Sequence, residues 1–274
     1  MKARFRAVLP ALVLTGVAQI GCARALREPP PLTDPAGGGG ATARPERVPP
    51  LLLRANLLYA ARNLTEVREA GKVWLEAARA DTTRVEGLEG AARAYVWLTE
   101  HETDAPARQS AATLAVNAAQ WCERIKPGSA SCVYWLGAAL GVQAREKQST
   151  ALDALPRIED AFKRAATADP MIEYAGPDRA LALLYLRAPG WPTGPGDPDL
   201  GLQHARKAVE LAPDYPPNDL ALGEALAATG DMQGARGAYE RALEKARRLA
   251  DDGEPDAGEW IRQAGDALAG ISNH

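Results

Sequence analysis

A helix-ending pattern that repeats along the chain constrains its fold more than any other feature. From about residue 51 onward, small and apolar residues recur three and four positions apart, as on one face of an α-helix. Prolines end successive helical stretches at Pro127, Pro170 and Pro213, so the same ending returns at intervals of 43 residues. Equal intervals between equivalent positions indicate similar helical units that stack and share a continuous core. The sequence therefore predicts an all-α fold built from repeats.

The clearest unit lies in the segment 202–213 and the helix pair that follows it. Gly223 and Ala235 provide small side chains, Tyr239 an aromatic one, and Ala242 a further small one. This spacing resembles the tetratricopeptide repeat (TPR), a unit of about 34 residues whose two helices cross closely at small residues. The resemblance implies an all-α, TPR-like solenoid of helical hairpins with about four to five repeats and a C-terminal capping helix.

The 43-residue interval is longer than this repeat, and the additional residues fall between the two helices of a unit. Gly137 and Phe162 are 25 positions apart, whereas the equivalent Gly223 and Tyr239 are 16 apart. We therefore expect extended helices or structured loops as insertions between the paired helices, on one side of the solenoid. The predicted hairpins span residues 51–80, 84–126, 129–169, 173–212 and 216–250, and the capping helix spans 256–271.

The N-terminus has the pattern of an export signal. Three basic residues precede a largely apolar run of 14 residues, Ala7–Ile20, which is too short to span a bilayer and is typical of a signal peptide. Gly21-Cys22 follows directly and resembles a bacterial lipobox, which predicts lipidation of Cys22, although Gln19 stands where that pattern prefers Leu. Cleavage after Ala25 is the alternative. Both interpretations predict export.

The segment between the signal and the helices has the composition of a tether. Residues 23–50 contain seven prolines and the glycine run Gly37–Gly40, and such a stretch buries too little apolar surface to offset its ordering entropy. We expect a signal peptide over 1–22, a disordered tether over 23–50 and the helical domain over 51–274. The predicted location is the periplasm, with anchoring at the outer membrane favoured over the inner one and membrane contact only through the lipid.

Charge and motifs argue against nucleic-acid binding and against catalysis. Residues 1–49 hold seven of the 32 basic and three of the 35 acidic residues, which leaves 25 basic against 32 acidic, while a nucleic-acid face needs clustered Lys and Arg. No G-x-S-x-G, Walker or H-E-x-x-H motif is present. His101, His204 and His274 lie far apart, so we expect no metal site and no cofactor, and a solvated surface position for His204. The sequence predicts a binding protein rather than an enzyme.

Two cysteines lie across one predicted helix-turn-helix. Cys122 falls in the last turn of one helix and Cys132 opens the next, with the turn at residues 127–129 between them. A connection of ten residues in this arrangement brings the two α-carbons within the about 4.4–6.8 Å that a disulfide requires. An oxidising compartment favours the bond, which would contribute about 2–3 kcal/mol. The alternative is that Cys122 is simply a small buried residue.

The first helix of each TPR lines the concave face, and this rule assigns a candidate surface. An apolar groove there suits a hydrophobic ligand or an extended apolar peptide of a protein partner. The alternative for aromatic residues at helical spacing is the core between repeats. Trp191, in a Pro/Gly-rich insertion, either docks on the adjacent helices, which we favour, or meets a partner. The residues assigned to the concave face are Trp97, Tyr134, Ala138, Leu184, Tyr185, Leu220 and Ala227.

Four segments together resemble a narrower group. They are Tyr134–Gly137, Ala182–Leu186, Ala188–Pro192 and Gly196–Pro198. They are similar to the TPR lipoproteins that form the T-component of tripartite ATP-independent periplasmic (TRAP) transporters, over about residues 85–245. The resemblance implies a periplasmic lipoprotein that binds a solute-binding protein and holds a hydrophobic ligand in a central groove. We therefore keep two hypotheses, an exported scaffold or adaptor for protein partners and, as the alternative, a transport accessory of this type.

Overall fold

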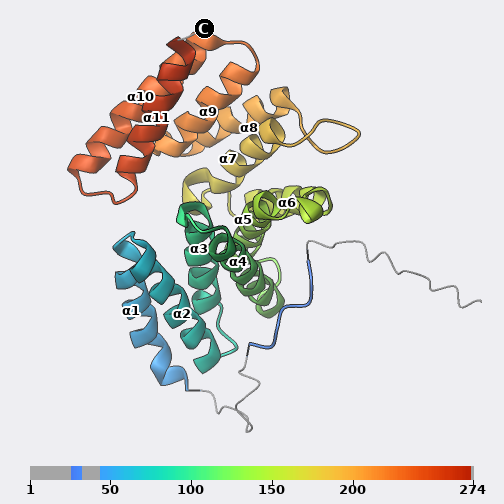
Figure 1. Ribbon diagram of the computed structural model, residues 1–274, viewed down its shortest axis with the longest axis vertical. Helices are drawn as coiled ribbons and strands as arrows, with labels where there is room; N and C mark the ends of the chain where they lie inside the picture. Colours follow the sequence, from blue (N-terminus) through green and yellow to red (C-terminus); the bar gives the residue numbers. More distant parts are fainter. Residues whose placement is uncertain (1–25, 33–43, 273–274) are drawn as a thin grey trace, which may run out of the picture.

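The computed structural model describes residues 26–32 and 44–272, and in this part the chain is helical throughout (Figure 1). A short 3-10 helix, Pro45–Arg47, is followed by eleven α-helices that pack pairwise along the described chain. The pairs are α1 (Val48–Ala60) with α2 (Leu64–Ala80), α3 (Glu86–His101) with α4 (Ala105–Ile125), α5 (Ala130–Glu146) with α6 (Gln148–Ala168), α7 (Ile172–Arg187) with α8 (Pro198–Leu211), and α9 (Pro216–Ala228) with α10 (Met232–Asp251), and α11 (Ala257–Ser272) packs on α10.

This arrangement confirms the all-α solenoid of helical hairpins. The five hairpins agree with the predicted ranges to within a few residues, and α11 occupies the range predicted for the capping helix. Side chains cap several helix starts by accepting a hydrogen bond from a free backbone N–H of the first turn. These caps are Asn63, Asp104, Asp197 and Asp231. None of the described helices is long and apolar enough to cross a membrane.

Close helix crossings explain why small residues recur at fixed spacing. A methyl group at Gly223 would lie 2.4 Å from the ring of Tyr239, and one at Gly137 would lie 2.8 Å from the ring of Phe162. No real carbon contact is that short, so only glycine permits the two helices of each hairpin to approach this closely. The aromatic ring of the second helix fills the space that the glycine leaves.

The additional residues of the longer repeats are placed in two different ways. In the hairpins α3–α4 and α5–α6 they lengthen the helices: α3 and α5 have 16 and 17 residues, against 13 in α9, and α4 and α6 have 21 each, against 20 in α10. In the hairpin α7–α8 they form the loop of residues 188–197, where Gly190 and Gly196 form an isolated parallel bridge. Both predicted solutions, extended helices and a structured loop, therefore occur in one chain.

Part of the predicted tether contacts the helical domain. Residues 26–32 lie beside α2 and α4, and the indole Nε1 of Trp121 donates a hydrogen bond of 2.8 Å to the carbonyl oxygen of Pro30 (Figure 1). Helix α1 begins at Val48, inside the range assigned to the tether. Within the range 23–50 that we expect to be a disordered tether, apolar and hydrogen-bonding groups of α2 and α4 therefore contact residues 26–32. Cys22 and the signal peptide lie outside the described residues.

Candidate functional site

The candidate site is a cavity of about 1120 Å³ on the inner side of the solenoid. Its walls come from α3, α5 and α7, which are the first helices of three successive hairpins, and from α6. Three turns close it, those between α1 and α2, between α8 and α9, and between α10 and α11. A smaller pocket of about 380 Å³ shares Arg93, Trp135 and Glu173 with it. Segments from both ends of the chain therefore form one site.

Aromatic rings form much of the cavity wall. The Tyr134 ring lies 5.1 Å from that of Trp135, edge to face, and 5.8 Å from that of Phe162. A second pair of rings also lines the cavity, where Tyr215 stacks on Tyr174 at 4.7 Å between the ring centroids. Such pairs add to the stability that burial of the rings already supplies. Burial raises the pKa of Tyr215 to about 12, as it does for Tyr59 at the α1 end, so both hydroxyls are neutral near pH 7.

A left-handed turn positions part of this wall. Glu173, Tyr174 and Ala175 have φ angles of 49°, 56° and 62°, which costs roughly 1–2 kcal/mol per residue for side chains other than glycine. Arg179 holds the turn by donating hydrogen bonds to the carbonyl oxygens of Glu173, at 3.2 Å, and Tyr174, at 3.0 Å. Its guanidinium also donates to Oδ1 of the buried Asn218 at 2.8 Å. Strain of this kind is concentrated at functional sites.

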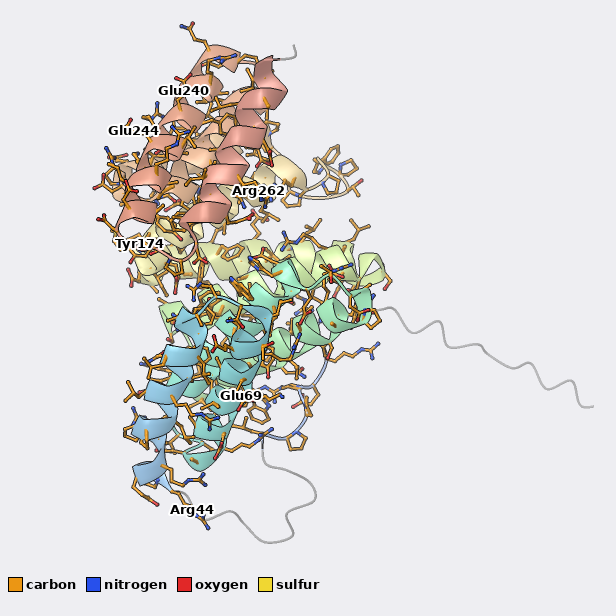
Figure 2. The ribbon with its side chains drawn as sticks, turned by 60° about the vertical axis from the view of Figure 1, so that its left-hand side comes forward. Arg44, Glu69, Tyr174, Glu240, Glu244 and Arg262 are labelled. Carbon is orange, nitrogen blue, oxygen red and sulfur yellow. A yellow bond between two sulfur atoms is a disulfide. The ribbon has the colours of Figure 1, made fainter. Side chains whose placement is uncertain are left out.

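The turn places Tyr174 where the first six helices meet the last five (Figure 2). Its side chain is 61% exposed, although one face of its ring is stacked on Tyr215. An aromatic ring exposed on one side at the edge of a cavity is available to an occupant.

Charged groups frame the apolar wall. Arg145 donates to Glu100 at 2.7 Å, and Arg187 donates to both carboxylate oxygens of Glu224, at 2.8 and 2.6 Å. Arg93 lies instead over the rings of Tyr59 and Trp74, and within the described chain it forms no ion pair. The site therefore has apolar walls, a paired ionic rim and a guanidinium stacked on aromatic rings.

One ion pair closes the cavity between the two ends of the solenoid. Nε of Arg62, in the turn after α1, donates to both carboxylate oxygens of Asp256, at 2.9 and 3.1 Å, in the turn before α11. The same guanidinium donates to the carbonyl oxygen of Tyr59 at 2.8 Å and lies over its ring. Arg62 has a φ of 49°, so its position requires a left-handed backbone. We refer to the pair Arg62–Asp256 as the latch.

Four of the residues assigned to the concave face line this cavity. Trp97 lies on α3, Tyr134 and Ala138 lie on α5, and Leu184 lies on α7. Trp97 stacks on His101, and within the described part of the chain its buried indole Nε1 has no hydrogen-bond partner. These four come from three successive hairpins, as the TPR rule for first helices requires.

The other assigned residues do not line this cavity. Tyr185 is 2% exposed and donates to Oε1 of Glu159 at 2.8 Å, because consecutive residues on a helix point about 100° apart and Leu184 takes the cavity side. Leu220 and Ala227 pack against the core between α7, α9, α10 and α11. Trp191 is 90% exposed, so it does not dock on the adjacent helices. Backbone hydrogen bonds from Gly196 to Pro189 and from Thr193 to Gly190 fold its loop into a turn of its own.

His204 also differs from its predicted surface position. Its side chain is 21% exposed, and its Nδ1 lies 2.8 Å from Oδ1 of Asp178, a carboxylate with no exposed surface. Burial alone would raise the pKa of Asp178, but hydrogen bonds from His204 and Lys207 outweigh it and lower that pKa. Asp178 and Asp219, which is held by Arg241 and Lys245, join the two helices of their hairpins and do not line the cavity.

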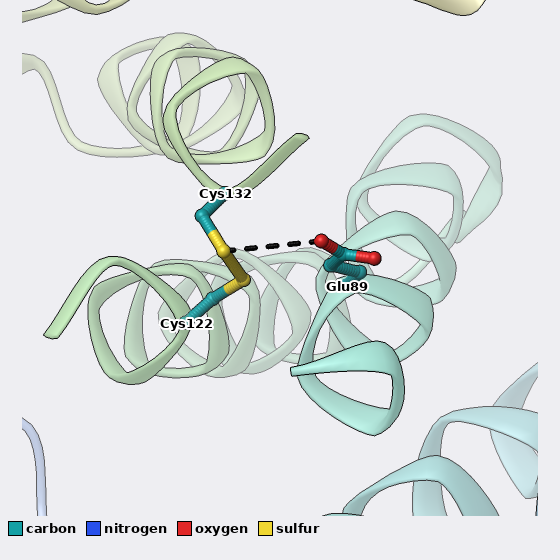
Figure 3. Close-up of side chains that lie close together, drawn as sticks. All are labelled: Glu89, Cys122 and Cys132. Carbon is teal, nitrogen blue, oxygen red and sulfur yellow. Dashed lines mark hydrogen bonds between the residues drawn. A yellow bond between two sulfur atoms is a disulfide. The ribbon is translucent and has the colours of Figure 1, made fainter. Parts of the chain in front are cut away.

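Cys122 and Cys132 are joined by a disulfide, with their α-carbons 5.3 Å apart (Figure 3). Oε1 of Glu89 lies 3.9 Å from the sulfur of Cys132. Disulfide sulfurs carry no thiolate, so these three side chains offer no metal site in this state. Burial raises the pKa of Glu89, and this favours its protonated form beside the apolar sulfurs. The bond connects the last turn of α4 to the first turn of α5.

Sequence reasoning missed several residues of the cavity. The largest omissions are Tyr59, Trp135, Tyr174, Tyr215 and Trp260. Tyr215 stands directly before the proline pair that opens α9, and Tyr174 stands two residues before Gly176-Pro177. An aromatic residue just before a proline-started first helix is therefore a usable signal for the end of the cavity wall. Tyr59 and Trp260 have no such local marker.

Comparison with known proteins supports the fold. No protein-family model matches the sequence, and no curated protein matches it. Among solved structures, TTC0263, a thermophilic TPR protein in Thermus thermophilus, is 19% identical, with a TM-score of 0.60 over 80% of this chain and 98% of that chain. MamA is 20% identical, with a TM-score of 0.45 over 68% of this chain and 92% of that chain. YrrB, a TPR protein with an unusual peptide-binding site, is 19% identical, with a TM-score of 0.41 over 73% of this chain and 87% of that chain. The likeness to TTC0263 shows a TPR-like solenoid.

Proposed function

We propose that this protein is an adaptor that binds an apolar segment of a partner protein in its central cavity. The observation that carries the proposal is the aromatic lining of the cavity, to which Tyr134, Trp135 and Phe162 contribute together with Tyr174 and Tyr215. Sites for drug-sized molecules have volumes of about 300–1,000 Å³, and a cavity of about 1120 Å³ is larger than that range. A peptide segment with several apolar side chains fits this size.

The location that we propose is the periplasm, with a lipid anchor at Cys22. The basic start, the apolar run and Gly21-Cys22 support export. The disulfide supports it independently, because such bonds persist in oxidising compartments. An adaptor held by a lipid at its N-terminus would meet its partners close to the membrane.

A second candidate function is that of a TRAP T-component-like accessory lipoprotein. The latch favours it, because Arg62–Asp256 encloses the cavity between the two ends of the solenoid, and enclosure suits a small hydrophobic solute. In that case the partner is a periplasmic solute-binding protein that exchanges the solute with the cavity.

A site-specific photo-crosslinker tests the adaptor. A photoreactive residue at Ala138, inside the cavity, is expected to link the full chain to its partner in the source cells, whereas one at Ala269, exposed on α11, is not. Peptide mapping of the product should locate the link in an apolar stretch of the partner. Equal labelling from both positions would contradict binding in the cavity.

Native mass spectrometry separates the two candidates. Protein purified without detergent that carries a lipid or organic acid, and loses it in Ala138→Trp but not in the control Ala269→Trp, supports the transport accessory. A cavity free of small molecules, together with a partner linked at position 138, supports the adaptor. A solute-binding protein recovered as that partner would decide for transport.

A further inference from the structure

Residues Leu26–Leu32 occupy a surface on α2 and α4 that the cavity does not include. Trp121 Nε1 donates to the carbonyl oxygen of Pro30 at 2.8 Å, and Nε of Arg79 donates to that of Leu32 at 3.0 Å. Arg124 forms an ion pair with Glu28 and lies over the Trp121 ring. Two carbonyl oxygens and one carboxylate of the segment are thus recognised by three side chains.

The sequence of the segment determines its conformation. Pro29, Pro30 and Pro31 follow one another, and each proline fixes its own φ near −65°. Each also drives the residue before it towards extended or polyproline-II geometry, so Pro29 and Pro30 are restricted twice and Glu28 once. A polyproline-II segment makes no internal hydrogen bonds and presents its carbonyl groups outward. It loses little conformational entropy on docking, because it is already ordered.

The side chains of the segment reinforce the docking. Pro29 is buried, and Leu32 packs with Trp121 and Ile125 beside the disulfide. Leu26 packs against the main core. The contacts thus recognise the shape, the backbone and the charge of the segment. Its two leucines, one on each side of the proline run, pack on apolar groups, an indole N–H binds a carbonyl oxygen of the run, and an arginine binds the acidic residue.

We propose that Trp121, Arg79 and Arg124 form a docking site for a proline-rich, polyproline-II segment, and that its occupant is Leu26–Leu32 of the same chain. Aromatic surfaces that donate an N–H to a polyproline-II carbonyl are a recurrent way of binding such segments. The docked segment is a strap that fixes where the N-terminal part of the chain leaves the domain. This inference does not depend on what the cavity binds.

The position of both strap ends explains why the occupant comes from the same chain. Leu32 is bound to Arg79, and Arg44 donates through its backbone N–H to the carbonyl oxygen of Ala80 at 2.7 Å. Leu32 and Arg44, which are twelve positions apart in the sequence, therefore contact neighbouring residues of α2. A short connection of this kind gives the strap an effective concentration in the millimolar range.

Competition with a synthetic peptide tests the site in the full chain. The probe is a fluorescent peptide of residues 24–34, and the variant replaces Pro29, Pro30 and Pro31 together with glycine. The peptide should bind this variant at least about tenfold more tightly than the wild type, in which the strap occupies the site. Adding Trp121→Phe, which keeps the ring but removes the N–H, or Arg79→Met should weaken that binding, whereas Lys72→Met on the exposed side of α2 should not.

Three results would overturn the proposal. One is equal peptide binding by the wild type and the triple-glycine variant, which would show that the strap does not fill the site. Another is no binding by a triple-glycine variant whose circular dichroism equals that of the wild type. The third is a wild-type dimer that becomes monomeric in this variant, which would show that the segment docks on a second copy rather than in the same chain.

Discussion

The first six helices and the last five build the same kind of hairpin with different interiors. In the N-terminal half, α1–α6, one continuous apolar cluster contains large rings such as Trp74, Tyr95 and Phe162. In the C-terminal half, α7–α11, the buried apolar residues are mostly alanines, and Asp178, Asn218 and Asp219 are completely buried. The difference shows that the same hairpin can form around large aromatic rings or around small residues with buried polar groups.

One aligned position makes the comparison direct. Gly137 and Phe162 of the hairpin α5–α6 correspond to Gly223 and Tyr239 of the hairpin α9–α10. Four residues before these glycines stand Val133 and Asp219, both buried. The close helix crossing therefore occurs in both halves. The buried position one turn before the glycine is filled by the apolar Val133 in one half and by Asp219, a carboxylate held by two cations, in the other. The repeat fixes the glycine and the ring and leaves the residue one turn earlier open.

Placing the carboxylate of the C-terminal half at the equivalent position of the N-terminal half should have the largest effect on the free energy of unfolding. Val133→Asp places a carboxylate in the apolar half without a cation partner, and an uncompensated buried charge costs about 3–5 kcal/mol. Val133→Thr has nearly the same shape and loses less, about 1–3 kcal/mol for one hydroxyl. Urea unfolding at pH 7 gives both values. A Val133→Asp variant as stable as the wild type would show that this half accepts charge as readily as the other.

Removal of the disulfide should weaken only the N-terminal half. Cys122 and Cys132 close a loop of ten residues, and its loss costs about 2–3 kcal/mol in the chain-entropy model. Hydrogen exchange in a Cys122→Ala/Cys132→Ala variant should rise in α4 and α5, while exchange in α9 and α10 should not change. Ala242→Ser in the C-terminal half provides the reverse pattern as a control. Uniform loss of protection would mean that the two halves unfold as one unit.

Acid should affect two buried carboxyls in opposite directions. Hydrogen bonds lower the pKa of Asp178, so its contribution is present above its ordinary pKa and is lost as pH falls through the lowered one. Burial raises the pKa of Glu89, so the folded state gains stability as pH falls and loses it as pH rises through the raised pKa.

Single variants separate the contributions of Asp178 and Glu89 to the pH dependence of stability. Asp178→Asn should lower the unfolding free energy by about 1.5–3 kcal/mol at pH 7, because charge-assisted hydrogen bonds are lost, and by progressively less below pH 4. Glu89→Gln should flatten the opposite slope, which lies between the ordinary pKa of a glutamate and the raised pKa of Glu89. Unfolding by denaturant at a series of pH values, extending below the ordinary pKa of each carboxyl group and up to neutral pH, measures both slopes. Slopes of the same sign for the two variants would contradict these assignments.

The sequence predicts the hairpins well because close packing acts locally. Spacings such as Gly223 to Tyr239 follow from one helix crossing, and the shifted spacing Gly137 to Phe162 already indicates a longer unit. The side of each helix that faces the cavity depends on the curvature of the whole stack, which no local pattern encodes. Only the structure therefore shows that Leu184, and not Tyr185, faces the cavity.

Strained turns and contacts between distant positions could not be predicted from the sequence for a related reason. The left-handed turn at Glu173–Ala175 contains no glycine, so its composition gives no sign of positive φ angles, and its carbonyl oxygens accept hydrogen bonds from Arg179 and Asn218. His204 looks like a surface residue because its partner Asp178 is 26 positions away. Polar pairs across helices can be recognised only once the hairpin register is known.

The latch joins the two halves and should give the smallest energetic effect. Arg62 and Asp256 are 194 positions apart and partly exposed, so their coupling is expected to be about 0.5–1 kcal/mol. Asp256→Asn keeps the shape of the side chain and removes its charge, while Asp252→Asn, at an exposed carboxylate nearby, is the matched control. Denaturant unfolding should scarcely distinguish the two variants.

Distance measurements should distinguish Asp256→Asn from Asp252→Asn. Spin labels on Ala60 and Gly253 report the separation of the turns after α1 and after α10, and this separation should widen in Asp256→Asn and at 1 M salt, which screens charges beyond about 3 Å. If the two halves are rigid units joined at α7, the latch sets only their relative position, so a small free energy controls access to a large cavity. A separation that stays unchanged in Asp256→Asn would mean that contacts at α7 alone hold the halves together, and occupants would then have to enter without any opening between the turns.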